Sequence, residues 1–118
     1  TLLDKSVKKT NFLKKATALL GLKNVTILCG DLNSLKLDIS SDTITCRAFK
    51  TIPEILTFTK NMFNEGVKYI LYKGRKEKID EELTNASGDF SFSSRIIPLK
   101  NPSSKERHII ILEKKESR

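Results

Sequence analysis

Thr1-Leu2-Leu3-Asp4, followed by residues 5–20, is the stretch that decides the fold. The first four residues are typical of a buried parallel strand that ends in a carboxylate, and the next run is typical of an amphipathic helix. The second β-α unit of nucleotide-binding α/β domains has this form, because its acid accepts hydrogen bonds from a ribose diol. We therefore expect Asp4 to bind a ribose. The competing interpretation is that Asp4 is the N-cap of the helix that follows.

The first β-α unit of such a domain should carry a glycine-rich loop, but the five glycines of this sequence contain no Gly-x-Gly. Position 1 is also not a methionine. We therefore expect residues 1–118 to be the C-terminal part of a single domain within a longer protein.

Composition narrows the possible functions. A chain of 118 residues with 38% hydrophobic residues has material for one core and not for two. Its net charge of +8 favours a polyanionic partner, although a purely solubilising role for the lysines stays open. No apolar run approaches the ~20 residues needed to span a bilayer. The two cysteines lack metal-ligand spacing and suit a reducing compartment.

The helix predicted over residues 5–20 has two distinct faces, and Gly21 stands where a left-handed C-cap belongs. We expect one face to be buried, and its residues are Phe12, Leu13, Ala16, Leu19 and Leu20. The opposite face is basic and consists of Lys5, Lys8, Lys9, Lys14 and Lys15.

The remaining sequence predicts strands over 25–29, 43–47 and 67–72, and a short charged helix over 76–86. Thr51-Ile52-Pro53-Glu54 is a capping box that opens another helix. That helix should bury Ile52, Ile55, Leu56, Thr59, Met62 and Phe63. The run at 67–72 is almost continuously apolar, which predicts a strand covered on both faces. Residues 90–99 and 108–112 are strand-like and joined by a polar loop over 100–105, which predicts an antiparallel hairpin.

The predicted order is therefore β-α-β-α-β-α-β-α-β-β. Parallel units followed by a terminal hairpin describe an α/β, Rossmann-like class I methyltransferase with a mostly parallel sheet and its first β-α unit missing. A dehydrogenase sheet would stay parallel to its end.

Four blocks occur in order along the chain: Leu2-Leu3-Asp4 with Lys8-Lys9 and Asn11-Phe12-Leu13; the run Asp42-Thr43-Ile44-Thr45-Cys46-Arg47-Ala48-Phe49; Lys73-Gly74; and Glu106-Arg107-His108 with three isoleucines. In this order and spacing they resemble the RsmG family, also called GidB. These bacterial methyltransferases act on a guanine N7 of small-subunit ribosomal RNA. The resemblance covers essentially the whole chain.

The resemblance implies S-adenosylmethionine as cofactor, 16S ribosomal RNA or the small ribosomal subunit as partner, and a cytoplasmic location. The residues that it implies for the cofactor site are Asp4, Leu32, Asn33 and Arg47. Leu32 and Asn33 would flank the adenine, although an ordinary turn stays open for them. Arg47 would end its strand at the ligand-binding edge of the sheet, although it could equally pair with Asp42 or Glu54.

Candidates for contacts with RNA phosphates are Lys8, Lys9, Lys73 and Arg107. For any one of them a solvated surface charge stays open as an alternative. We expect His108, the only histidine, to be a hydrogen-bonded structural residue. Guanine N7 has a free lone pair, so its methylation needs no general base. The sequence accordingly predicts no catalytic side chain and no metal site.

The methyltransferase strand order 3-2-1-4-5-7-6 places the missing first strand at the centre of the sheet. Its removal leaves two internal edges unpaired, so we expect the strand to be present in the sample, to come from another copy, or to be replaced by rearranged pairing. In this order Cys29 and Cys46 end strands roughly 14 Å apart, which excludes a disulfide. Two other functions stay open: a non-catalytic basic RNA-binding fragment, and a different Rossmann-like nucleotide-binding enzyme.

Overall fold

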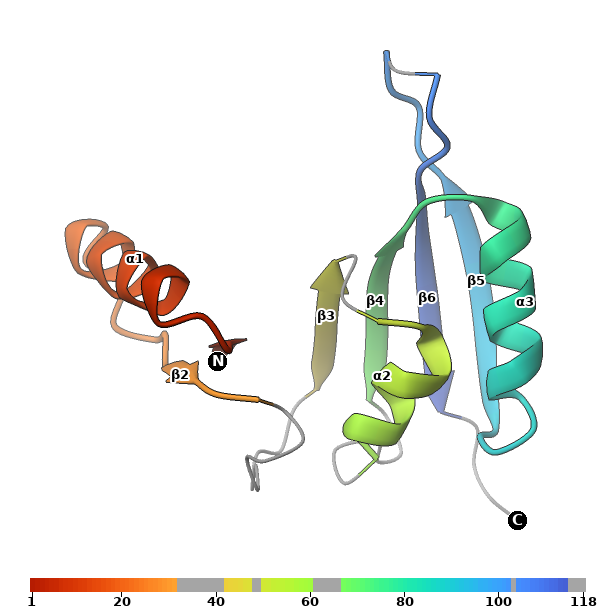
Figure 1. Cartoon of the computed structure of the whole chain (residues 1–118), viewed down its shortest axis with the longest axis horizontal. Helices are drawn as coiled ribbons and strands as arrows, with labels where there is room; N and C mark the ends of the chain where they lie inside the picture. The colour runs from red at the N-terminus through yellow and green to blue at the C-terminus, as the bar shows by residue number, and fades with distance from the viewer. Residues whose placement is uncertain (32–41, 48–49, 61–66, 103, 115–118) are drawn as a thin grey trace. The chain divides into compact units, whose positions relative to one another are not determined.

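The computed structural model describes residues 1–31, 42–47, 50–60, 67–102 and 104–114 (Figure 1). The chain divides into two compact units, Thr1–Asp38 and Ile39–Arg118, and each is described by itself.

The first unit contains strand β1 (Leu2–Asp4), helix α1 (Val7–Leu19) and strand β2 (Ile27–Cys29). β1 and β2 pair in parallel, with Leu2 opposite Ile27 and Asp4 opposite Cys29. The β-α-β unit predicted from residues 1–29 is therefore confirmed.

Both ends of α1 are closed by local hydrogen bonds. Ser6 is the N-cap, and its hydroxyl accepts a hydrogen bond from the Lys9 amide at 3.2 Å. At the other end Gly21 has φ 65°, as its predicted C-cap role requires. The Leu22 amide donates to the Thr17 carbonyl and the Gly21 amide donates to the Ala18 carbonyl, both at 3.1 Å. These two bonds form a Schellman motif.

The prediction that the apolar face of α1 is buried is wrong for three of its five residues. Phe12, Leu19 and Leu20 are 70%, 88% and 71% exposed, while Leu13 and Ala16 are half-buried. The covered side of the helix is a different one: it contains Thr10, which is buried, with Leu13 and Thr17, which are half-buried. These residues follow one another by three and four positions and so share one side of the helix, whereas Phe12 and Leu19 lie on another side.

The second unit contains strand β3 (Thr43–Arg47), helix α2 (Ile52–Phe58), strand β4 (Lys68–Lys73), helix α3 (Lys76–Ala86) and strands β5 (Phe92–Pro98) and β6 (His108–Lys114). Its strands are ordered β3-β4-β6-β5. β3 and β4 are parallel, and β6 runs antiparallel to both of its neighbours. This is the expected order 4-5-7-6 with the predicted terminal hairpin, while β1 and β2 correspond to strands 2 and 3.

Within the described residues β1 and β3 belong to separate sheets, so this part of the chain does not show the rearranged pairing that was one alternative. The other two alternatives for the missing strand stay predictions. The helix expected between the second and third strands falls within residues 32–41, outside the described residues. Among the described helices, none is long and apolar enough to cross a bilayer.

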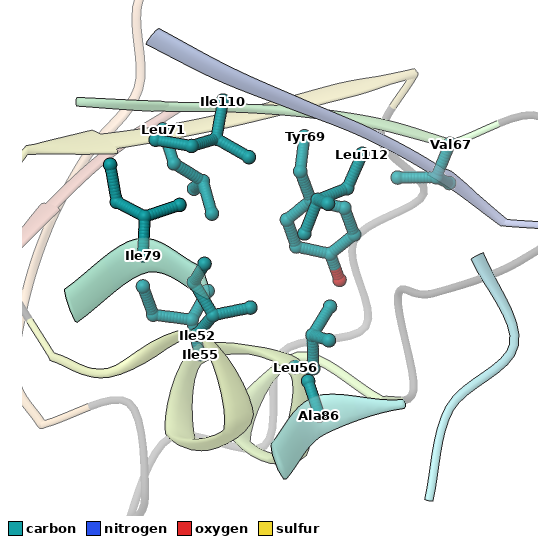
Figure 2. Close-up of a cluster of buried hydrophobic side chains, with 10 residues drawn as sticks. All are labelled: Ile52, Ile55, Leu56, Val67, Tyr69, Leu71, Ile79, Ala86, Ile110 and Leu112. Carbon is teal, nitrogen blue, oxygen red and sulfur yellow. The ribbon is translucent and has the colours of Figure 1, made fainter. Parts of the chain in front are cut away.

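The core of the second unit lies between the sheet and its two helices. Figure 2 shows the side chains of α2 and α3 directed toward those of β4 and β6. The buried cluster consists of Ile52, Ile55, Leu56, Val67, Tyr69, Leu71, Ile79, Ala86, Ile110 and Leu112. Four of the six residues predicted for the buried face of α2 are confirmed: Ile52, Ile55, Leu56 and Thr59. The remaining two, Met62 and Phe63, lie outside the described residues.

The prediction that β4 is covered on both faces is wrong. Tyr69 and Leu71 are fully buried, but Tyr72 is 43% exposed and Lys68 is exposed. The physical reason is that α2 and α3 both cover the same face of the sheet (Figure 2). The strand therefore shows the alternation of a half-covered sheet.

A buried hydrogen bond joins β4 to the end of α2. The hydroxyls of Tyr69 and Thr59 lie 2.5 Å apart, and the Thr59 hydroxyl also donates to the Ile55 carbonyl at 2.7 Å. Burial raises the pKa of Tyr69 to about 12. The folded protein therefore favours the neutral phenol.

Gly21→Ala is expected to lower the free energy of unfolding by about 1 kcal/mol, because a Cβ strains the left-handed backbone. Gly88→Ala is the matched control. Its added Cβ would lie 3.6 Å from the Asn85 carbonyl oxygen, an ordinary contact, and its φ is not left-handed. Denaturant unfolding followed by circular dichroism measures both variants. Equal effects of the two substitutions would contradict the Schellman assignment.

Tyr69→Phe is expected to lower the free energy of unfolding at neutral pH by about 1 kcal/mol, since one buried hydrogen bond is lost. An unfolded tyrosine ionises near pH ~10, whereas Tyr69 in the folded protein has a pKa of about 12. The stabilisation is therefore complete below pH ~10 and is lost as the pH rises through the folded value.

The stability difference between wild type and Tyr69→Phe should accordingly shrink between pH ~10 and ~12, as measured by urea unfolding at a series of pH values. The exposed Tyr72→Phe variant is the control and should keep the alkaline profile of the wild type. A constant difference across this range would count against a buried neutral phenol.

Candidate cofactor and nucleic-acid site

The candidate site of the second unit lies at the edge of the sheet where β3 and β4 end and β6 begins (Figure 1). In the sheet register Arg47 lies opposite Tyr72, and Lys73 lies opposite His108. The antiparallel direction of β6 therefore places Arg107 and His108 at the same edge as the carboxyl ends of the parallel strands. Ligands of open α/β sheets bind at this edge.

Asp4 ends β1 in the first unit, as predicted. Its Oδ1 accepts a hydrogen bond from the Ser6 amide at 2.8 Å, while Ser6 itself caps α1. The competing interpretation of Asp4 as the N-cap is therefore wrong. The carboxylate is half-buried, and its Oδ2 accepts no hydrogen bond from the described residues. A carboxylate held in this way has an acceptor left for a ribose hydroxyl.

The two other residues expected at the cofactor, Leu32 and Asn33, lie outside the described residues. Gly30 directly follows β2, and its amide donates to the Asp4 carbonyl at 3.0 Å. Cys29 and Cys46 are both free thiols.

Arg47 ends β3 and is exposed. Ile44 and Cys46 of the same strand pack against the core, so the alternation of the strand directs Arg47 to the opposite face. The proposed alternative was an ion pair with Asp42 or Glu54. Within the described residues Arg47 makes neither pair, and Glu54 instead lies 3.8 Å from Lys50.

Lys73 has an internal role that the sequence analysis did not foresee. Its ammonium donates to Glu82 Oε1 at 3.0 Å and to the Lys50 carbonyl at 2.6 Å, and its side chain is only 13% exposed. A phosphate contact would require Lys73 to leave both partners. That Lys73 contacts RNA therefore stays a prediction, against which its two internal hydrogen bonds count.

The Glu106-Arg107-His108 block holds the turn that follows β4. His108 is buried, and its Nδ1 lies 2.6 Å from the Gly74 carbonyl oxygen. The Glu106 carboxylate accepts a hydrogen bond from the Lys76 amide at 3.1 Å, at the first turn of α3. The prediction that His108 is a hydrogen-bonded structural residue is confirmed. Arg107 is exposed, and its guanidinium donates to the Glu106 carbonyl at 2.8 Å.

The first unit presents a basic surface. Residues 1–31 contain six lysines and two aspartates, and Lys8 and Lys9 are exposed on α1. Neither lysine forms an ion pair with a described residue. Such unpaired cations are available to a polyanion.

Among the described residues at this edge, the side chains supply charge and hydrogen bonds rather than an activated nucleophile. Burial raises the pKa of the half-buried Cys46 thiol, and the nearby Lys73 ammonium only partly offsets this effect. The thiol therefore stays neutral. Among the described residues no cluster of potential ligands could hold a metal ion.

The sequence analysis did not foresee the structural roles of two carboxylates, Glu82 and Glu106. A signal for Glu82 exists in the sequence of α3, because an acid three residues after Ile79 and four before Ala86 lies on the apolar stripe of the helix. An acid on such a stripe indicates a buried partner. No local pattern identifies Glu106, whose partner is thirty residues away along the chain.

Comparisons with known proteins agree with this geometry. Residues 1–110 match the family model described as rRNA small subunit methyltransferase G, or GidB. Among related proteins, ribosomal RNA small subunit methyltransferase G of Brachyspira hyodysenteriae is 38% identical over 95% of this chain. The protein of the same name from Laribacter hongkongensis is 35% identical over 95% of this chain. The chain spans about half the length of these curated relatives, 54% and 53% respectively.

Solved structures show the same fold. The crystal structure of an rRNA methylase from Streptococcus thermophilus superposes with a TM-score of 0.71 at 15% identity, over 97% of this chain and 72% of that one. The N-methyltransferase NodS from Bradyrhizobium japonicum gives a TM-score of 0.69 at 10% identity, over the same shares of the two chains. The methyltransferase-like α/β fold is therefore confirmed, and by its match over residues 1–110 the chain belongs to the rRNA small subunit methyltransferase G family.

Proposed function

We propose that the protein containing this chain transfers a methyl group from S-adenosylmethionine to a guanine N7 of 16S ribosomal RNA. The observation that carries the proposal is the family match over residues 1–110. Because the chain spans about half of its relatives, this is a proposal about the whole protein. Action on ribosomal RNA would place it in the cytoplasm.

The residues of this chain could bind the ribose and adenine of the cofactor but not its methionine end. S-adenosylmethionine, when bound, supplies an electrophilic methyl group. Asp4 would accept hydrogen bonds from its ribose, because one carboxylate oxygen is held by Ser6 and the other is open. Leu32 and Asn33 would flank the adenine, and Arg47 would contribute from the end of β3. This chain contains no Gly-x-Gly to hold the methionine end.

The chemistry requires little from side chains. Guanine N7 carries a lone pair and no proton, so no base is needed to activate it. The protein must hold N7 in line with the methyl group and must accept the target base outside its stack. This requirement agrees with a site that lacks an activated nucleophile among its described residues.

RNA would be held by exposed cations. Lys8 and Lys9 on α1 have no acidic partner among the described residues, and Arg107 lies at the ligand-binding edge. Lys73 is excluded from this set because its ammonium is engaged inside the protein.

Methyl transfer from labelled S-adenosylmethionine to small ribosomal subunits, with mapping of the modified base, tests the proposal directly. Asp4→Ala is expected to weaken cofactor binding by about 10- to 100-fold, since a hydrogen bond to a charged group is lost. Asp89→Ala removes an exposed carboxylate and is the control. RNA binding without any response to the cofactor would contradict the proposal and favour a non-catalytic RNA-binding protein.

The double variant Lys8→Ala/Lys9→Ala is expected to bind RNA more weakly and with a shallower salt dependence. The slope of log K against log salt should fall by roughly 1.5, because each phosphate contact contributes about 0.7 to 0.9. Lys60→Ala/Lys78→Ala removes the same charge from exposed positions of the second unit. Identical slopes for the two double variants would show that the basic face of α1 does not contact RNA.

A further inference from the structure

One oxygen atom near the carboxyl end of β4 receives two hydrogen bonds from different elements. Glu82 Oε1 accepts from Lys73 Nζ at 3.0 Å and from the Ile52 amide at 2.8 Å. Lys73 Nζ donates in addition to the Lys50 carbonyl at 2.6 Å. The pair Lys73–Glu82 therefore joins the end of β4, the middle of α3 and the start of α2.

This pair differs from the other ion pairs among the described residues. Its side chains are 13% and 14% exposed. The next shortest pair, Lys68–Glu113, spans 3.6 Å with side chains 47% and 57% exposed. Burial excludes competing water and salt, so the Lys73–Glu82 contacts hold one fixed geometry. For Lys73 to reach an RNA phosphate, Glu82 would have to keep a largely buried charge without its partner.

The segment that the pair holds is directly connected to Arg47. Lys50 and Ile52 follow Arg47 by three and five residues, and Arg47 lies opposite Tyr72, the neighbour of Lys73. Within the described residues β3 pairs with β4 alone. The contacts of Lys73 and Glu82 with Lys50 and Ile52 lie just beyond the end of β3 along the chain.

We propose that Lys73 and Glu82 are positioning residues that fix Lys50 and the start of α2, close in sequence to Arg47, for the methyl transfer, and that Lys73 does not itself contact RNA. The inference rests on the proposed function for its catalytic consequence. The inference has a structural half, which is that the pair restrains the Ile52 amide, and a catalytic half, which is the effect on methyl transfer. The structural half does not depend on any activity.

Three variants of the purified protein test this inference. Lys73→Met/Glu82→Met removes both charges together, so that neither is left buried and unpaired and the fold is kept. Glu82→Gln keeps an oxygen acceptor for the Ile52 amide and loses the charge. Lys76→Met/Asp80→Met is the matched control, because that pair on α3 spans 3.9 Å and its side chains are 62% and 56% exposed.

Two measurements are made on each variant. Amide hydrogen exchange at Ile52, followed by nuclear magnetic resonance without cofactor or RNA, should accelerate by about 10-fold or more in the double variant, which loses a bond to a charged group. Its kcat should fall by about 10- to 100-fold, as expected for a small displacement of positioned groups. Its KM for RNA and the salt dependence of binding should not change. Glu82→Gln should be intermediate, and the control pair should match the wild type.

The alternatives give different results. If Lys73 contacts phosphate directly, Lys73→Met/Glu82→Met should raise the KM for RNA and lower the salt slope by about 1, while Glu82→Gln should leave kcat unchanged. Unchanged exchange at Ile52 in the double variant would overturn the structural half. If the double variant does not fold, unchanged exchange and kcat in Glu82→Gln overturn the inference. If the wild type binds no cofactor and methylates no RNA, the proposed function and the catalytic half fail together, while the exchange measurement still decides the restraint.

Discussion

The antiparallel insertion of β6 between β4 and β5 is the constraint on which the second unit depends. It aligns the start of β6 with the carboxyl ends of β3 and β4. It also supplies Ile110 and Leu112 to the core that α2 and α3 cover. Strand β6 therefore contributes both to the core and to the candidate site. Its inward-facing residues complete the core, and His108 at its start contacts the Gly74 carbonyl in the turn after β4.

The charged groups at the edge where β3 and β4 end and β6 begins fall into two classes with different structural roles. Buried or bonded groups hold the backbone: Lys73 and Glu82 fix the start of α2, and Glu106 holds the first turn of α3. Exposed groups such as Arg47 and Arg107 remain available to ligands. A buried ion pair contributes little net stability, since desolvation offsets much of its attraction. The hydrogen bonds that Glu82 accepts from Lys73 and from the Ile52 amide instead fix the geometry at the start of α2.

Local patterns predicted most of the fold, and they failed where burial depends on distant partners. The bounds of α3 and the caps at Gly21 and Thr51 follow from residues within a few positions of each other, and the final hairpin follows from two strand-like runs joined by a polar loop. By contrast, the apolar stripe of α1 predicts burial whether or not a surface exists to cover it, and Phe12 and Leu19 are exposed. In the candidate site, the position of Lys73 in the Lys73-Gly74 block suggested a phosphate contact. In the structure its ammonium pairs with Glu82 on α3, a contact that only the tertiary structure reveals.

The measurement that tests the account most directly is amide hydrogen exchange of the protein with and without saturating S-adenosylhomocysteine, followed by mass spectrometry. The account predicts protection at the carboxyl ends of β1 and β3, in peptides that contain Asp4 to Ser6 and Arg47 to Thr51. Peptides at the opposite end of the second sheet, which contain Lys68 and Phe92, should exchange unchanged. Protection at that opposite end, or no protection anywhere, would contradict the account.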